Sequence, residues 1–178
     1  MTEKLTINRS TLRLEKGDIT DTEVEAFVYY ARNDLVLWSG YGTAVSIRGG
    51  PSVQEELDKL GPQETTSAVI TTAGEMKATY IIHAVGPKFQ EQNIPEKLRK
   101  TIENVLESAD KKGIKQIAFP PMGTGFYCIP LDVSAEIVLG TITDYLMGDT
   151  RIEDVVIMLL DSREYNPYHD KLSALEQV

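Results

Sequence analysis

Two hydrophobic patterns alternate along the chain: short continuous apolar runs, and longer stretches in which apolar residues recur at helical spacing. Continuous runs of this length are typical of strands buried on both faces of a sheet. They occur at residues 24–31, 67–72, 80–85, 114–119 and 155–160. Two short alternating runs between residues 5 and 14 predict one or two further strands with an exposed face. Together these runs predict a largely parallel sheet with apolar central strands.

Stretches with helical spacing predict the helices between these strands. The longest extends from Ile94 to Ala109 and is closed by Gly113. Other helices are predicted at residues 44–48 with Thr43 as the cap, at 51–60, at 131–147 and, after a polar segment over 161–170, from about His169. Strands that alternate with helices in this way predict an α/β fold, a three-layer α/β/α sandwich.

Length and composition favour one soluble unit. The chain of 178 residues, 42% of them hydrophobic, fits a single domain over residues 1–178 with its own core. It has no apolar run of about 18 residues, and its first residues lack the basic-then-apolar form of a signal peptide. We therefore expect a cytoplasmic protein without a membrane partner. The single cysteine, Cys128, excludes an internal disulfide, and with two histidines it is a poor basis for a metal site.

The formal net charge of −9 narrows the class of ligand. Binding of a nucleic-acid polymer relies on clustered Lys and Arg, so a direct nucleic-acid partner is not expected. A small phosphorylated ligand is compatible with this charge, because backbone amides hold a phosphate without formal positive charge.

Two Gly-x-Gly loops, Gly40–Gly42 and Gly123–Gly125, each follow a predicted strand and precede a predicted helix. Glycines allow the backbone to approach a ligand closely, and the amides of such loops can converge on an anion. Neither loop has the third glycine of the dinucleotide fingerprint or the Gly-Lys-Ser/Thr end of a nucleotide P-loop. Because ligands bind at the carboxyl ends of parallel strands, we expect the two loops to hold a diphosphate from both sides.

Three single residues have more than one chemical interpretation. Asp18 follows a predicted strand, where it is either a turn cap or an acceptor for an amino group of a ligand. His83, in an apolar strand, is interpreted as a hydrogen-bonded core residue. Cys128 has no neighbouring base in the sequence and is more typical of a small buried residue than of a nucleophile. No catalytic residue is assigned.

Several short segments follow one another in a recognisable order. They are Gly17–Thr20, Ala26–Val28, Gly40 and Ala44, Gly49–Ser52, Tyr80–Val85, Phe119–Pro120 and Gly123–Gly125. In this order and spacing they resemble the macro domain family, an ADP-ribose-binding α/β/α module, over nearly the whole chain. The resemblance implies a six-stranded mixed, largely parallel sheet between helices.

The resemblance also implies roles for individual residues. Asp18 would accept the adenine amino group beside the amide of Ile19, and Tyr127 would lie against the distal ribose. The two sides of the diphosphate cradle would be Ser39, Gly40 and Tyr41 on one side, and Gly123, Thr124, Gly125 and Phe126 on the other.

The chain departs from the family pattern around this implied site. Arg32 replaces an asparagine that orients the distal ribose or a catalytic water in hydrolytic members, and arginine cannot accept a hydrogen bond. It is expected to pair with a phosphate or with an acid of its own domain. Trp38 lies where relatives carry glycines, and Gly42 lies where some hydrolases carry an aspartate. Leu160 lies where relatives often stack an aromatic ring on adenine, so apolar contact would replace stacking worth about 1 kcal/mol.

These observations predict a binding module for ADP-ribose or a related adenine nucleotide, free or attached to a protein, without efficient hydrolysis and without a cofactor. One alternative is an enzyme that hydrolyses an ADP-ribosyl ester or a phosphate on ADP-ribose. Another is an interaction module whose pocket has degenerated and is filled by Trp38 and Tyr41. The sequence does not specify the oligomeric state.

Overall fold

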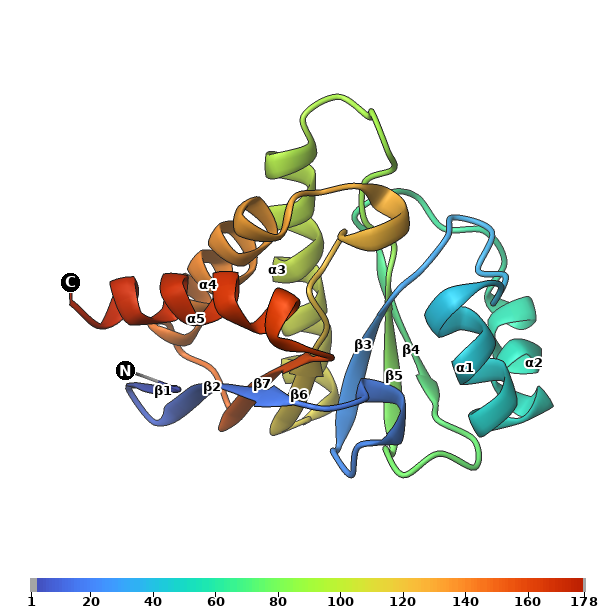
Figure 1. Ribbon diagram of the computed structural model, residues 1–178. Helices are drawn as coiled ribbons and strands as arrows, with labels where there is room; N and C mark the ends of the chain where they lie inside the picture. Colours follow the sequence, from blue (N-terminus) through green and yellow to red (C-terminus); the bar gives the residue numbers. More distant parts are fainter. Residues whose placement is uncertain (1–2, 178) are drawn as a thin grey trace.

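The computed structural model describes residues 3–177, and strands and helices alternate through most of this range (Figure 1). The strands are β1 (Lys4–Ile7), β2 (Ser10–Lys16), β3 (Ala26–Tyr30), β4 (Ala68–Thr72), β5 (Tyr80–Ala84), β6 (Gln116–Phe119) and β7 (Asp154–Leu159). The helices are α1 (Gly40–Gly49), α2 (Pro51–Leu60), α3 (Ile94–Lys112), α4 (Leu131–Leu146) and α5 (Ser162–Glu176). Two short 3-10 turns, η1 (Ile19–Asp21) and η2 (Gly125–Tyr127), follow β2 and β6.

The strands form one sheet in the order β1-β2-β7-β6-β3-β5-β4. Neighbours from β2 to β5 are parallel, whereas β1 with β2 and β4 with β5 are antiparallel. The predicted α/β/α sandwich with a mixed, largely parallel sheet is confirmed, with seven strands in place of six. The two short runs near the start form separate strands because Asn8, with φ of 54°, turns the chain between them.

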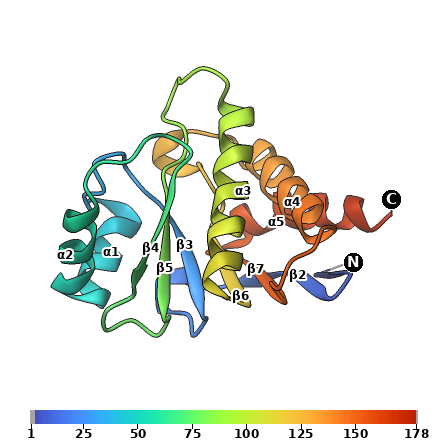
Figure 2. The ribbon, with the colours of Figure 1, turned by 180° about the vertical axis from the view of Figure 1, so that it is seen from behind.

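Helices α3, α4 and α5 cover one face of the sheet, and α1 and α2 lie against the other (Figures 1 and 2). Strand β3 contributes to both cores with alternate side chains. Ala26 and Val28 belong to the core formed with α3 and α4, whereas Phe27 and Tyr29 belong to the core formed with α1 and α2. Burial on both faces explains why this strand is apolar throughout instead of alternating.

Helix α1 begins at Gly40, so the prediction that Thr43 caps this helix is wrong. Ser39 precedes the helix with φ of 49° and makes no side-chain cap hydrogen bond. A Cβ atom added at Gly42 would lie 2.6 Å from the Tyr29 hydroxyl oxygen, so this turn fits closely against β3. This close packing outweighs the low helix propensity of glycine.

Helix α5 begins at Ser162, so the predicted start near His169 is also wrong. The Asp161 carboxylate accepts a hydrogen bond from the Glu164 amide at 3.1 Å, and the Glu164 carboxylate accepts one from the Leu160 amide at 2.8 Å. This reciprocal pair resembles a capping box and stabilises the start of the helix. It lies within the segment whose polar composition indicated irregular structure.

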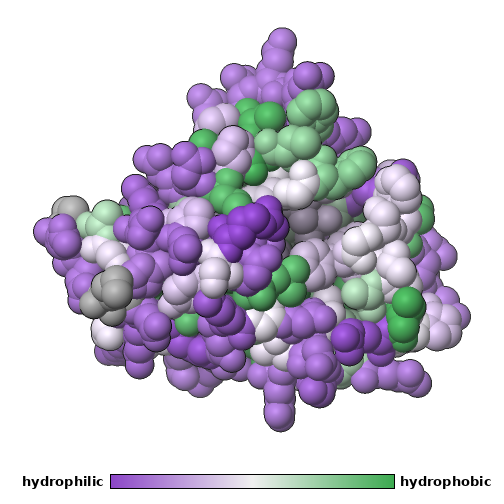
Figure 3. All heavy atoms as spheres, viewed as in Figure 1, coloured by the Kyte–Doolittle hydropathy of each residue, from purple (hydrophilic) through white to green (hydrophobic). Residues whose placement is uncertain are grey.

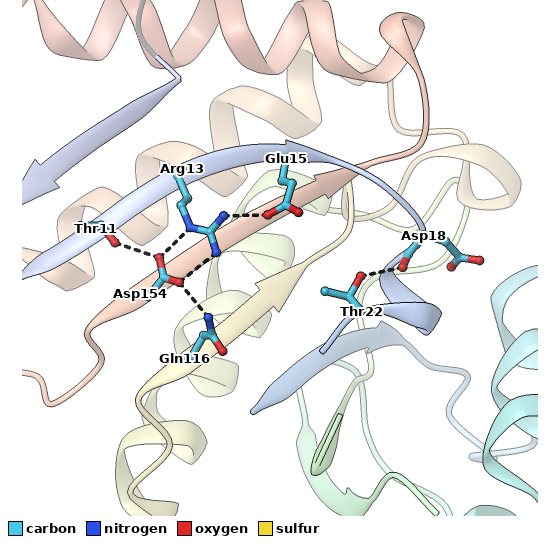
Figure 4. Close-up of polar contacts among 7 residues, drawn as sticks. All are labelled: Thr11, Arg13, Glu15, Asp18, Thr22, Gln116 and Asp154. Carbon is cyan, nitrogen blue, oxygen red and sulfur yellow. Dashed lines mark hydrogen bonds and ion pairs between the residues drawn. The ribbon is translucent and has the colours of Figure 1, made fainter. Parts of the chain in front are cut away.

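A polar network crosses β2, β7 and β6 on one face of the sheet (Figure 4). Asp154 accepts hydrogen bonds from Thr11 Oγ1 at 2.8 Å, from Arg13 Nε at 3.0 Å and from Gln116 Nε2 at 3.0 Å. Burial acts to raise the pKa of Asp154, but the hydrogen bonds from its three partners outweigh burial and lower the pKa. The network therefore joins three neighbouring strands through one ionised carboxylate.

Replacing Asp154 with alanine is expected to lower the free energy of unfolding by about 1–3 kcal/mol, because Arg13 and its neighbours lose their common acceptor. The matched control is Glu153→Ala. The Glu153 side chain is exposed and pairs with Lys115 at 3.3 Å, so the expected change is within about 0.5 kcal/mol. Urea unfolding measures both values, and equal losses would show that the network contributes no special stability.

His83 on β5 is fully buried and hydrogen-bonded, as predicted for a core residue. Its Nε2 atom lies 2.9 Å from Thr71 Oγ1, while its Nδ1 atom has no hydrogen-bond partner among residues 3–177. The ring also makes an edge contact with Tyr29, at 5.8 Å between centroids. Burial lowers the pKa of His83 from 6.5 to about 3, so the ring is neutral near pH 7.

Candidate functional site

A cleft of about 710 Å³ opens at the carboxyl ends of β3 and β6. Its walls come from the segment between β3 and α1, the segment between β6 and α4, and the start of α5. Apolar side chains interrupt the mostly hydrophilic surface around the centre of the face in Figure 3. The position agrees with the rule that open α/β sheets bind ligands beyond the carboxyl ends of parallel strands.

The two glycine loops form opposite walls of this cleft. In the first, Ser39 and Gly40 both have positive φ, 49° and 51°, and lead directly into α1. The first amides of a helix have no intrahelical acceptor, so those of Gly40 and Tyr41 are available to a ligand. In the second, Gly123 and Gly125 have φ of 77° and 68°. The loops therefore bring backbone donors to one cavity from two separate segments.

Buried hydroxyls support the second loop from behind. Ser134 on α4 donates a hydrogen bond to the carbonyl oxygen of Met122 at 2.7 Å, and its hydroxyl lies 2.7 Å from that of Tyr168 on α5. Both side chains are fully buried. The carbonyl before Gly123 is thus held by groups from two helices, which favours one conformation of the loop.

Aromatic side chains gather at one end of the cleft. The rings of Trp38 and Phe126, from opposite walls, meet edge to face with centroids 6.2 Å apart. Arg32 lies over the Trp38 ring at 4.7 Å, and its Nη2 atom pairs with Asp34 at 2.7 Å. Trp38 is 47% exposed and Phe126 is 74% exposed, so these rings lie at the rim and leave the cavity open.

The other end of the cleft is lined by η1, Tyr41 and the start of α5. Burial is the largest cause that raises the pKa of Tyr41, to about 12, and the negative charges of Glu164, Asp18 and Asp161 add to it. The hydroxyl of Tyr41 therefore remains protonated near several carboxylates. This end offers acceptors, whereas the middle of the cleft offers backbone donors.

The comparisons with known proteins agree on one family. The family model for the macro domain matches residues 31–138. A macro domain-containing protein of Caldanaerobacter subterraneus subsp. tengcongensis is 38% identical over 175 residues, which cover 95% of this chain and 99% of the relative. The chain belongs to the macro domain family. A macro domain-containing protein of Listeria monocytogenes is 34% identical over 171 residues, 92% of this chain and 97% of the relative.

Solved macro domain structures share the fold. A mutant Oceanobacillus iheyensis macrodomain with ADPR has a TM-score of 0.93 and 28% identity, over 98% of this chain and 98% of that one. The Trypanosoma brucei macrodomain in complex with ADP-ribose has a TM-score of 0.84 and 26% identity, over 90% of this chain and 68% of that one.

In this macro domain, most of the residues implied as ligand contacts surround the same cleft. The lining includes Ile19, Arg32, Ser39, Gly40, Tyr41, Gly123, Thr124, Gly125, Phe126 and Tyr127. Residues far apart in the sequence are therefore brought together as a group. Their contact with a ligand stays a prediction.

Two of the implied contacts, Asp18 and Leu160, lie outside the lining of this cleft. The Oδ1 atom of Asp18 accepts from the amide of Thr20 at 2.9 Å, and its backbone carbonyl accepts from Thr22 (Figure 4). Its Oδ2 atom lies 3.5 Å from Arg48 Nη2. Leu160 is 51% exposed. Asp18 therefore caps η1 with one carboxylate oxygen and leaves the other oxygen beside Arg48.

Cys128 follows η2 and is exposed, so its interpretation as a small buried residue is wrong. It has φ of 62° and its amide donates to the carbonyl of Gly125 at 3.0 Å, which ends the turn. The neighbouring Ile129, in contrast, is buried in the core.

Sequence reasoning missed several residues that line the cleft, and Tyr29 and Glu164 are two of them. Tyr29 is part of an apolar strand, and only the alternation along β3 distinguishes its direction from that of Tyr30. Glu164 follows Asp161 by three residues, the spacing of a capping box, and this signal would have found both the helix start and the residue.

Within residues 3–177, no helix is long and apolar enough to span a membrane. In the same part of the chain, no three His, Cys, Asp or Glu side chains are grouped so that they would hold a metal ion.

Proposed function

We propose that this macro domain binds ADP-ribose or a closely related adenine nucleotide, free or attached to a protein. The observation that carries the proposal is the convergence of two loops, around Gly40 and around Thr124, on one cleft. Backbone amides on both sides suit a diphosphate, and the cleft volume of about 710 Å³ suits a ligand of dinucleotide size. The relatives solved with ADPR and with ADP-ribose support the same ligand class.

The proposal places adenine at the end lined by η1 and α5, and the distal ribose at the aromatic end. Asp18 Oδ2 and the amide of Ile19 are the groups proposed to receive the adenine edge. Asp18 pairs there with Arg48 at 3.5 Å, a distance at which the contact is weak and a ligand amino group can compete. Leu160, half exposed beside this end, is proposed to supply apolar contact only.

We propose binding without efficient hydrolysis. Arg32 lines the distal end and is already paired with Asp34 at 2.7 Å, and an arginine has no lone pair with which to orient a water as an acceptor. The Sγ atom of Cys128 lies 3.6 Å from the carbonyl of Phe126, which is no base. An open cavity beneath Trp38 argues against the alternative of a filled, degenerate pocket.

Isothermal titration with ADP-ribose and with AMP tests this function. ADP-ribose is expected to bind at least about tenfold more tightly than AMP, because AMP lacks the second phosphate that the two loops would share. An assay for ADP-ribose released from a modified carrier protein is expected to detect no turnover. If neither nucleotide gives heat at millimolar concentration, the proposal is wrong. Rapid release of ADP-ribose from the carrier protein would instead show that the domain is a hydrolase.

A further inference from the structure

The hydroxyl of Tyr29 is a donor at the cleft that finds no acceptor among the described residues. Tyr29 is 8% exposed, lines the cleft and reaches the first turn of α1. No hydrogen bond joins its hydroxyl to another of residues 3–177, whereas the adjacent Tyr30 donates to the carbonyl of Pro87 at 2.5 Å. Among residues 3–177 this hydroxyl is not one of the fully buried atoms without a partner, so it is open to the cleft and available to donate to a ligand there.

Arg32 adds further donors around the same hydroxyl. Arg32 lines the same cleft as Tyr29 and Tyr127. Burial raises the pKa of both tyrosines, and the charge of Arg32 acts in the opposite direction with a smaller effect. Burial raises the pKa of Tyr29 to about 12, so the hydroxyl keeps its proton and donates. Among residues 3–177, Arg32 donates only from Nη2 to Asp34, so its other N–H groups remain available. The cluster suits an oxygen acceptor, and the charge of Asp34, which acts on both tyrosines and is paired with Arg32, offsets the preference of Arg32 for an anion.

Aromatic faces surround these donors. Tyr127 packs against Tyr30 with centroids 4.5 Å apart and against Phe126 at 5.4 Å. Phe126 also meets Trp38 and is 74% exposed, so much of its ring is available for stacking. A ribose alone would contact these faces only through its C–H groups, and a phosphate would use the donors but not the rings. A planar ring with an oxygen substituent uses both.

We propose that the aromatic end of the cleft takes a pyridine ring bearing a carboxamide or carboxylate, carried on the distal ribose, so that the macro domain binds pyridine dinucleotides. The inference rests on the proposed function, because the adenine and diphosphate positions are the same. Phe126 stacks on the ring, and Tyr29 and Arg32 donate to its oxygen substituent. The carboxamide and carboxylate forms share this chemistry, because the pair of Arg32 with Asp34 presents donors with little net charge.

Isothermal titration of the whole chain tests the inference with four ligands: ADP-ribose, ADP-ribose with a terminal phosphate, nicotinamide adenine dinucleotide and nicotinic acid adenine dinucleotide. At least one dinucleotide is expected to bind about threefold or more tightly than ADP-ribose. Tyr29→Phe is expected to weaken that dinucleotide about fivefold and ADP-ribose less than about twofold, because only the hydroxyl is removed. Phe126→Ala is expected to weaken binding of the same dinucleotide by a similar factor, because the stacking on its pyridine ring is lost.

Tyr80→Phe is the matched control, since Tyr80 lies at the amino end of β5, outside the cleft lining, and its change should leave every affinity as it was. Thermal unfolding checks that each variant is folded. If Tyr29→Phe does not fold, Phe126→Ala still tests the inference, because Phe126 is exposed and its change should not unfold the protein. If Tyr29→Phe lowers the affinities for ADP-ribose and for the dinucleotide equally, or if neither dinucleotide binds while ADP-ribose does, the inference is overturned and the proposed function stands. Tighter binding of the ADP-ribose with a terminal phosphate than of either dinucleotide would overturn it by assigning the donors to that phosphate. If none of the four ligands binds, the proposed function itself is wrong.

Discussion

Replacing Gly123 with alanine is expected to weaken ADP-ribose binding more than about tenfold and to lower the free energy of unfolding by about 2 kcal/mol. Gly123 has φ of 77°, a conformation that costs an L-residue energy. An added Cβ atom would overlap the Cδ1 atom of Ile129, whose amide donates to the Gly123 carbonyl at 3.0 Å and closes the loop. The loop is expected to shift to relieve this overlap, and the shift would displace the backbone amides proposed to hold the diphosphate.

The matched control is Gly140→Ala on α4. A Cβ atom at Gly140 meets no other atom within 4 Å, and the residue lies inside a helix, so alanine is expected to add about 0.5–1 kcal/mol of stability. Its affinity for ADP-ribose should match that of the unaltered chain. Titration calorimetry and urea unfolding measure both variants. If Gly123→Ala binds ADP-ribose about as tightly as the unaltered chain, the second loop is not part of the diphosphate site.

Acid is expected to destabilise the protein through His83. Its pKa is about 3 in the folded protein and 6.5 in the unfolded reference, so below pH 6.5 the unfolded chain takes up a proton that the folded protein does not. The free energy of unfolding should therefore fall by roughly 1 kcal/mol for each pH unit from about 6.5 downwards. Carboxylates with lowered pKa values, such as that of Asp154, lose their stabilising charge only below about pH 4. The window from about pH 6.5 to about pH 5 thus isolates the histidine.

His83→Leu removes the titrating group while keeping an apolar side chain in the core. Thr71 keeps a partner in this variant, because its hydroxyl also lies 2.9 Å from the carbonyl oxygen of Thr72. Urea unfolding at intervals from about pH 7 to about pH 5 is expected to show a slope in the unaltered chain and a nearly flat profile in the variant. Equal slopes would mean that His83 is protonated in the folded state or that another group titrates.

The sequence predicted the architecture well because most elements depend on periodic burial. β3 is continuous and apolar because both of its faces are covered, and α3 shows its buried stripe directly. The predictions failed or stayed open where a single local contact sets the boundary of an element. Whether residues 5–14 form one strand or two stayed open, because the turn at Asn8 has no glycine or proline to mark it. The start of α1 at Gly40 was missed, where Gly42 fits closely against Tyr29.

The candidate site could be predicted only in part, for a related reason. Loop glycines such as Gly40 and Gly123 are visible in the sequence, and the resemblance assigned the residues around them. The direction of a side chain within an apolar strand is not visible in the same way. Tyr29 and Tyr30 are adjacent, identical and both line the cleft, yet only the hydroxyl of Tyr30 donates to a carbonyl of the described chain, that of Pro87. That difference depends on the register of β3 against its neighbours.

The aromatic rim also has a practical consequence, because Trp38 is the single tryptophan of the chain. Its indole is half exposed, lies beneath the Arg32 guanidinium and touches Phe126 across the cleft. Indole emission depends on solvent contact and on nearby cations and rings. The protein therefore carries its single indole at the entrance of the cavity, and a ligand that enters is expected to change the wavelength or intensity of indole emission without any attached dye.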